Sequence, residues 1–433
     1  MIPAGVHRNL KLRIGVGFVR KFLDIMLAPL MVIHFSHLYG AATAGLMTFA
    51  IAVAVVGCTF IGGHMSDTLG RRPTLLLGEI GSAAALALLA LANSPWWHSG
   101  AVTFCCYLLS TSLFGIAVPA NDAMMVDIST QKTRTQIYTI NYWSINVAFL
   151  LGSLVGGFAF GAFFFQLLLG AAVLAGVIAL ITLVAISETA PSGPGGTAQA
   201  PAARSWLRTL LDGYVTALRD SVLARLVLSA LLIRSVEIQI SYYIAVRLSK
   251  DFGQHQLLGF GPWRPTVDGV EMLGILRAAN TLIVVCLALF ATWLFGRLSD
   301  RQRIFGGIVL FTAGYMVWGA SNAPWLLLAA AVVLTVGELM SVPIRQVLLA
   351  DLVPADDRSR YMAVYQINVQ LGMVVASLCL ALGVLIPAIG MSVLFGLFGV
   401  GALLIYWSLF RERDARAAVP RPTAEVQEST QQT

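Results

Sequence analysis

The stretch Gly62-Gly63-His64-Met65-Ser66-Asp67-Thr68-Leu69-Gly70-Arg71-Arg72-Pro73 separates two long apolar segments of the chain. It combines an acid, a turn glycine and two arginines, and charged groups of this kind are costly inside a bilayer. Lys and Arg concentrate in the short loops on the cytoplasmic side of membrane proteins. The stretch therefore predicts a tight cytoplasmic connection between two membrane-spanning helices.

The composition also indicates a membrane protein. The chain has 433 residues, of which 58% are hydrophobic and 11% charged, and its mean hydropathy is +0.81. Soluble proteins carry about 25% charged residues, so these few charges are too sparse to cover a water-facing surface. The net charge of +7 lies mostly in short segments between apolar runs. We expect these basic groups to face lipid headgroups, and we expect no nucleic-acid partner.

Apolar runs long enough to cross a bilayer, about 20 residues each, occur twelve times. They lie near 13–36, 41–63, 74–93, 100–125, 137–160, 162–187, 223–248, 272–295, 304–321, 325–351, 361–385 and 387–410. An even number of spans puts both termini on one side, and basic residues near both ends place that side in the cytoplasm. The prediction is an all-α, multi-pass protein of the cell's inner (plasma) membrane.

The chain divides into two groups of six spans. Residues 189–203, TAPSGPGGTAQAPAA, have the composition of a flexible linker. Apolar residues then recur at helical spacing over 206–218, which predicts an amphipathic helix on the inner membrane surface. The second group repeats features of the first, since 296–303 is a degenerate copy of the opening stretch. The predicted domains are an N-terminal six-helix bundle (1–187), a cytoplasmic linker (188–222), a C-terminal six-helix bundle (223–410) and a disordered tail (411–433).

The opening stretch, G-x-x-x-D-x-x-G-R-R, resembles the signature loop between the second and third helices of the major facilitator superfamily. Residues 146–158, NVAFLLGSLVGGF, are similar to the fifth-helix motif of the drug:proton antiporters in that superfamily. Ser153 stands where the motif has proline. Gly337-Glu338 lies in the tenth span, where some multidrug members place a functional carboxylate. The chain thus resembles the bacterial twelve-helix drug:proton antiporters, and the resemblance implies two six-helix bundles that rock around a central cavity.

The same resemblance implies a conformational latch at the cytoplasmic end. Asp67 would lie against the end of the eleventh helix and its dipole. Arg71 or Arg72 would pair with Asp127, which ends the fourth span. These contacts would hold the outward-open state. The alternative is that Arg71 and Arg72 only anchor the topology.

Ionisable residues within the spans are candidates for proton coupling, because each is costly in a membrane. The three candidate carboxylates are Asp24, Glu237 and Glu338. Burial favours the protonated form of a carboxyl, whereas a nearby arginine favours the ionised form. Such a group can therefore gain and lose a proton during transport. The alternative is that these acids form ion pairs that only fix helix packing.

Several other residues are candidates for substrate binding. Arg20 and Arg234 lie one turn from Asp24 and Glu237, and either arginine could bind an anionic group. Asn141 and Tyr142 open the fifth span, where an aromatic side chain could line a pocket or anchor the helix at the interface. Glu79 and Arg277 lie nearer the ends of their predicted spans, and we expect both side chains to snorkel towards the headgroups.

Gly152, Gly156 and Gly157 form a face of small residues on the fifth span. Such a face allows two helices to approach closely, and we expect the eighth helix as the neighbour. The functional interpretation is a packing surface that couples the bundles, and the alternative is ordinary close packing.

The sequence lacks an enzyme signature, a nucleotide-binding loop and metal-ligand spacing among its histidines and five cysteines. We therefore expect no catalytic residues, no metal and no cofactor. The predicted function is proton-coupled export of lipophilic small molecules by a monomer embedded in membrane lipids. One alternative is a transporter of an anionic or zwitterionic metabolite, such as a siderophore or peptide. The other is a membrane receptor that transports nothing.

Overall fold

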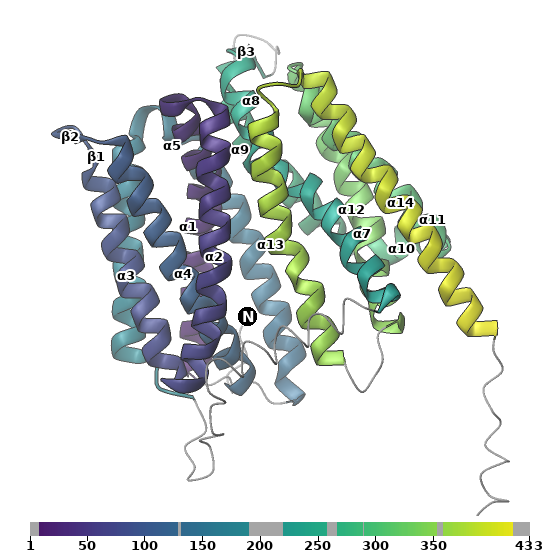
Figure 1. The fold of residues 1–433 in the computed structure, drawn as a ribbon, viewed down its shortest axis with the longest axis horizontal. Helices are drawn as coiled ribbons and strands as arrows, with labels where there is room; N and C mark the ends of the chain where they lie inside the picture. The colour runs from purple at the N-terminus through teal and green to yellow at the C-terminus, as the bar shows by residue number, and fades with distance from the viewer. Residues whose placement is uncertain are drawn as a thin grey trace, which may run out of the picture.

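The computed structural model describes residues 8–128, 131–189, 220–257, 266–288, 290–352 and 358–418. The predicted amphipathic helix at 206–218 and most of the linker lie outside these ranges. The first half of the chain forms five helices, the last of them kinked (Figure 1). They are α1 (Arg8–Tyr39), α2 (Ala41–Thr68), α3 (Arg71–Leu91), α4 (Gly100–Ile128) and α5 (Gln131–Ala185).

Helix α5 supplies two spans. Its 55 residues would extend about 80 Å as one straight helix, far more than the roughly 30 Å of a bilayer core. The backbone leaves helical geometry at Phe163, where φ is −130° and ψ is 31°. The kink lies next to the predicted boundary between the fifth and sixth spans.

The second half begins with a broken span, where the sequence predicts one continuous helix over 223–248. Helix α7 (Ser221–Glu237) is followed by a short 3-10 helix, η1 (Ile238–Ser241), and then by α8 (Tyr243–Asp251). The break falls at Tyr242, with φ −119° and ψ −98°. This corrects the prediction, and the local reason is a run of β-branched and aromatic residues, which have weak helix propensity.

The remaining helices complete the second half. They are α9 (Gly269–Ala288), α10 (Ala291–Phe295), α11 (Asp300–Ala320), α12 (Pro324–Leu352), α13 (Arg358–Leu382) and α14 (Ala388–Ala418). The eighth predicted span, 272–295, is thus divided between α9 and α10. Helix α14 continues eight residues past the predicted end of its span at 410, so the start of the predicted disordered tail is helical. Its residues Arg413 and Glu412 pair with Asp300 and Arg225, at 3.1 and 3.3 Å.

Two small hairpins lie between helices and were not predicted. Strand β1 (Asn93–Ser94) pairs with β2 (Trp97–His98), and β3 (His255–Gln256) pairs with β4 (Thr266–Val267). Figure 1 shows the labelled strands β1, β2 and β3 at one end of the molecule, which we call the hairpin end. The start of α1 and the end of α14 lie towards the opposite end, which we call the terminal end.

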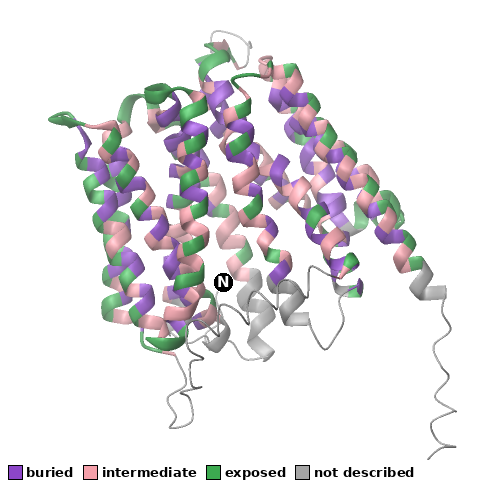
Figure 2. Cartoon of the chain, viewed as in Figure 1, coloured by how far each residue is buried: buried purple, intermediate pink, exposed green. Residues whose placement is uncertain are grey.

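Among the described residues, nine helices are long and apolar enough to cross a membrane. One of them is α5, which counts twice because of its kink. The more highly charged α1 and the broken α7–α8 segment complete the set. The fold is therefore an all-α membrane protein of twelve transmembrane helices in two six-helix bundles. Exposed residues run along the outside of the helices (Figure 2) and include many large apolar side chains, as lipid contact requires.

Candidate functional site

The C-terminal bundle holds a cavity of about 270 Å³ between α7, α12 and α13. Its charged lining residues are Arg234 and Glu237 from α7, and Glu338 and Arg345 from α12. Arg234 and Glu237 lie one turn apart, just before the break in the seventh span, and their side chains pair at 2.6 Å. Two of the three predicted proton-coupling acids thus line one cavity.

Glu338 differs from Glu237 in its partners. Its Oε2 accepts a hydrogen bond of 3.2 Å from Asn280 Nδ2 on α9, and Asn280 also donates to Thr335 at 2.8 Å. Within the part of the chain that the structure describes, no arginine or lysine pairs with Glu338 within 4 Å. Asn280 was not among the sequence-predicted site residues, although an amide within an apolar span is a signal that could have found it.

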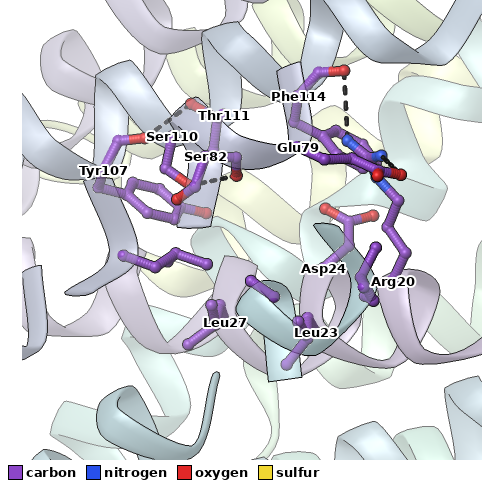
Figure 3. A pocket seen from close by; sticks show the side chains of 13 residues that line it. Arg20, Leu23, Asp24, Leu27, Glu79, Ser82, Tyr107, Ser110, Thr111 and Phe114 are labelled. Atoms are coloured by element: carbon purple, nitrogen blue, oxygen red, sulfur yellow. Dashed lines mark hydrogen bonds and ion pairs between the residues drawn. The ribbon is translucent and has the colours of Figure 1, made fainter. Parts of the chain in front are cut away.

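The N-terminal bundle holds a second, smaller cavity of about 70 Å³ (Figure 3). It is lined by Arg20 and Asp24 from α1, Glu79 and Ser82 from α3, and apolar and hydroxyl side chains from α4 and α5. Arg20 pairs with Glu79, with 3.4 Å between Nη1 and Oε1, and its guanidinium lies 3.2 Å from the centre of the Phe114 ring.

The residues of this second cavity correct one prediction and show which partner Asp24 takes. The Glu79 side chain is 2% exposed and therefore does not snorkel, because α3 begins at Arg71 and places Glu79 two turns inside the helix. Asp24 does not pair with Arg20, its neighbour on the same helical face. It accepts a hydrogen bond of 2.9 Å from Lys21 instead, and both side chains are substantially exposed.

The structure describes the side chains of two predicted latch residues, Asp67 and Arg72, in other surroundings than the predicted ones. Asp67 is exposed at the end of α2, and no ion pair or hydrogen bond of its side chain is recorded among the described residues. Arg72 donates from its guanidinium to Leu183 O at 2.7 Å, and its backbone N–H donates to Glu188 Oε2 at 2.9 Å. The side chain of Asp127 lies outside the described part of the structure. The pairing of Arg71 or Arg72 with Asp127 therefore stays a prediction.

The glycine face of α5 is in contact with helices of both bundles. A Cβ atom on Gly157 would lie 3.0 Å from Gly274 Cα in α9, the eighth-span helix. Gly152 and Gly156 instead approach the backbone of α1, where a Cβ would lie 2.9 Å from Phe22 O and 3.2 Å from Met26 O. The close approach to the eighth span is present at Gly157.

Asn141 and Tyr142 line neither of these two cavities. Tyr142 is 50% exposed, and its carbonyl accepts a hydrogen bond from Asn146. Their assignment to substrate binding stays a prediction.

Arg277 also departs from the sequence-based expectation. It lies two turns into α9, and its Nη1 atom is buried among the residues around the α5 glycine face. Snorkelling to a helix end does not describe this side chain.

Comparison with known proteins agrees with this architecture. The chain matches the sequence profile of the Major Facilitator Superfamily over residues 14–304 and 268–432. It is 26% identical to a Na(+), Li(+), K(+)/H(+) antiporter of Planococcus maritimus, over 95% of this chain and 97% of that protein. It is 23% identical to the multidrug resistance protein MdtH of Cronobacter sakazakii, over 89% and 90% of the two chains.

Among solved structures, the fold resembles a POT family transporter in complex with a thioalcohol-conjugated peptide. The TM-score is 0.73 at 14% sequence identity, with 94% of this chain and 96% of the other covered. Such a low identity supports the shared fold alone. With a profile match over nearly the whole chain, this protein belongs to the major facilitator superfamily and is a multi-pass secondary transporter.

Proposed function

We propose that the protein is a proton-coupled antiporter in which Glu338 carries the proton. The observation that carries this proposal is the pairing in the C-terminal cavity. Among the described residues, Glu237 neutralises Arg234 at 2.6 Å, while Glu338 accepts its one side-chain hydrogen bond from the amide of Asn280. A partly buried carboxylate with one neutral donor is less stabilised in its ionised form than one paired with an arginine. Glu338 is therefore the carboxyl best placed to take up and release a proton.

Protonation of Glu338 changes the net charge of the residues that line the C-terminal cavity. Arg234 and Arg345 contribute +2 and Glu237 and Glu338 contribute −2, so the lining is neutral when every group is ionised. Protonation of Glu338 gives the lining a net charge of +1. A cation held near the ionised carboxylate would then be repelled, and an exchange of proton for cation follows from electrostatics alone.

The packing between the bundles supports alternating access. Two close backbone approaches between the bundles lie towards the hairpin end, at Gly157 with Gly274 and at Gly45 with Ala381. A Cβ on Gly45 would lie 2.7 Å from Ala381 N. With the hairpin end outside and both termini in the cytoplasm, as the basic residues predict, these contacts favour a state in which the bundles meet on the outer side. An exposed Asp67 fits the same state, since its latch would form when the inner side closes.

The proposed substrate is a lipophilic cation, in keeping with the multidrug relatives. A second candidate is an alkali cation, and two observations favour it. The Planococcus maritimus relative is named for Na(+), Li(+) and K(+) exchange and aligns over 95% of this chain. In addition, the C-terminal cavity of about 270 Å³ lies just below the range of pockets for drug-sized ligands, which is about 300–1,000 Å³.

An anionic or zwitterionic metabolite has weaker support. Arg20 and Arg234 are the arginines that would attract such a solute, yet each pairs with a glutamate, Glu79 or Glu237. An anion would have to displace one of these carboxylates.

The experiment that tests the proposal is transport in inside-out membrane vesicles with an imposed pH gradient. Ethidium serves as the lipophilic cation, Na⁺ and K⁺ as the inorganic cations, and a dipeptide as the zwitterion. Accumulation of one cation that collapses on adding a protonophore would support antiport and identify the substrate class. Movement of the dipeptide alone would overturn the proposal in favour of metabolite transport.

A further inference from the structure

The Arg20–Glu79 pair lies inside the N-terminal bundle and belongs to no part of the proposed Glu338 site. Figure 3 shows the Glu79 carboxyl and the Arg20 guanidinium meeting beside the Phe114 ring. The distance of 3.4 Å between Arg20 Nη1 and Glu79 Oε1 is long for a charge-assisted hydrogen bond, which usually measures about 2.7–2.9 Å. This arginine therefore stabilises the ionised carboxylate less than a close pair would.

The other oxygen of Glu79 is the more informative atom. Oε2 is buried and accepts no hydrogen bond within the described structure. The Thr182 hydroxyl from α5 interacts with this carboxyl, and it too is buried without a geometrically satisfactory hydrogen-bond partner. Buried polar atoms are satisfied in most proteins, and a hydroxyl can satisfy Oε2 in either protonation state. Thr182 Oγ1–H can donate to the ionised Oε2, and when Oε2 is protonated, its O–H can donate to Thr182 Oγ1.

The charged groups around the pair allow Glu79 to become neutral without isolating Arg20. Three carboxylates act on Arg20: Glu79 from α3, Asp24 from α1 and Asp122 from α4. Arg13 of α1 adds a second positive charge near Glu79. When Glu79 is protonated, Asp122 and Asp24 still act on the guanidinium, although Asp24 also pairs with Lys21 at 2.9 Å. The cavity of about 70 Å³ also has room for water, which can deliver the proton.

We infer that Glu79 is a second proton-binding carboxyl, so that each bundle of the transporter binds one proton during the cycle. The inference rests on the proposed proton coupling and adds a site to it. A proton from water binds Glu79 Oε2, the new O–H donates to Thr182, and Arg20 shifts its interaction towards Asp24 and Asp122. Loss of the proton to water restores the Arg20–Glu79 pair, so the positive charge of Arg20 moves within the bundle as the proton binds and leaves.

Infrared difference spectroscopy of the purified full-length protein between acid and alkaline pH tests the site directly. The carbonyl band of a buried protonated carboxyl is separate from the bands of ionised carboxylates. We expect Glu79→Gln to remove one component of that band and Glu338→Gln to remove another. Glu412→Gln, a surface acid of α14 paired with Arg225, is the control and should leave both components. An unchanged band in Glu79→Gln would overturn the inference.

Thr182→Val provides a second readout if Glu79→Gln fails to fold. The variant removes the acceptor for the Glu79 O–H, so we expect the Glu79 component to shift while the Glu338 component stays. If neither component moves, Glu79 is not protonated at this position and the inference fails. This measurement needs no transport and so stands even if the proposed antiport is wrong.

Transport stoichiometry connects the site to function. In proteoliposomes with ethidium as the probe, the ethidium gradient that just opposes a fixed pH gradient reports the number of protons exchanged. We expect Glu79→Gln to lower this number by one while ethidium binding persists. An unchanged number would exclude a coupled proton at Glu79.

Discussion

The two bundles each contain an arginine–glutamate pair beside a cavity, but the pairs are built differently. Arg234 and Glu237 lie one turn apart on α7, pair at 2.6 Å and are 37% and 36% exposed. Arg20 and Glu79 come from different helices, pair at 3.4 Å and are 15% and 2% exposed. The short, accessible pair neutralises itself and leaves Glu338 as the reactive acid of its bundle. In the N-terminal bundle, where the pair is buried and its distance is longer, the acid that we infer to bind a proton is Glu79, a member of the pair itself.

The largest expected effect comes from removing the unpaired acid of the C-terminal cavity. Glu338→Gln keeps the hydrogen-bonding shape of the side chain but cannot exchange a proton. We expect proton-driven ethidium flux to fall to the level of protein-free vesicles while ethidium binding remains. Initial uptake rates and equilibrium binding in the same preparation measure the two properties. Proton-driven flux in this variant would show that Glu338 is not the proton carrier, and Glu412→Gln should behave as the wild type.

The next largest effect is expected from breaking the two arginine–glutamate pairs, which differ in how deeply they are buried. Arg20→Gln leaves a buried glutamate without its cation, which costs about 3–5 kcal/mol when the glutamate is ionised. Arg234→Gln breaks a substantially exposed pair, whose contribution is about 0–1 kcal/mol. Thermal unfolding in detergent should therefore show a much larger loss for Arg20→Gln.

The pH dependence of that loss follows from the same argument. Acid protonates the unpaired Glu79 and removes the uncompensated charge, so the stability lost in Arg20→Gln should be smallest at acid pH and grow as the pH rises. Arg234→Gln should show little of this dependence. Equal losses in the two variants would mean that burial does not distinguish the pairs.

These pairs also mark what the sequence could and could not predict. Arg234 and Glu237 are three residues apart, so their contact can be read from helical spacing. Arg20 and Glu79 are 59 residues apart, and their contact depends on how α1 packs beside α3. The depth of the two residues in the membrane was a usable signal, because α1 and α3 both start at the terminal end. Arg20 lies 12 residues after the start of α1 and Glu79 lies 8 residues after the start of α3, which is about 18 and 12 Å along the helix axes.

The fold was more predictable than the site. Twelve spans follow from apolar length, because the bilayer imposes one length on every helix. The break at Tyr242 did not follow, since the apolar pattern runs through it without interruption. The kink at Phe163 lies beside a boundary that the sequence already indicated. Apolar runs report burial in lipid, but they carry no information on where the backbone bends within it.

A smaller effect is expected where the bundles meet. Gly157→Val would place side-chain carbons against the backbone of Gly274, and overpacking of this kind costs about 1–3 kcal/mol. If the cost falls on the state with the hairpin end closed, the conformational equilibrium shifts about 5–150-fold. Gly161→Val lies one turn further along α5, where a Cβ meets nothing within 4 Å. Ethidium turnover should fall in the first variant only, and equal turnover would leave Gly157 without a role in closure.

The smallest effect is expected at the two related loops after the second and eighth spans. Asp67 in the first loop is exposed, whereas Asp300 in the second is held at 3.1 Å by Arg413 of its own bundle. Only Asp67 is therefore available to contact the other bundle when the terminal end closes. A carboxylate at a helix end contributes about 0.3–1 kcal/mol, so Asp67→Asn should slow interchange between states about two- to fivefold.

Turnover should fall without a change in the equilibrium affinity for ethidium, and Asp300→Asn should leave turnover unchanged. Equal slowing in both variants would instead assign the effect to surface charge, because only an Asp67-specific change reflects a contact between the bundles.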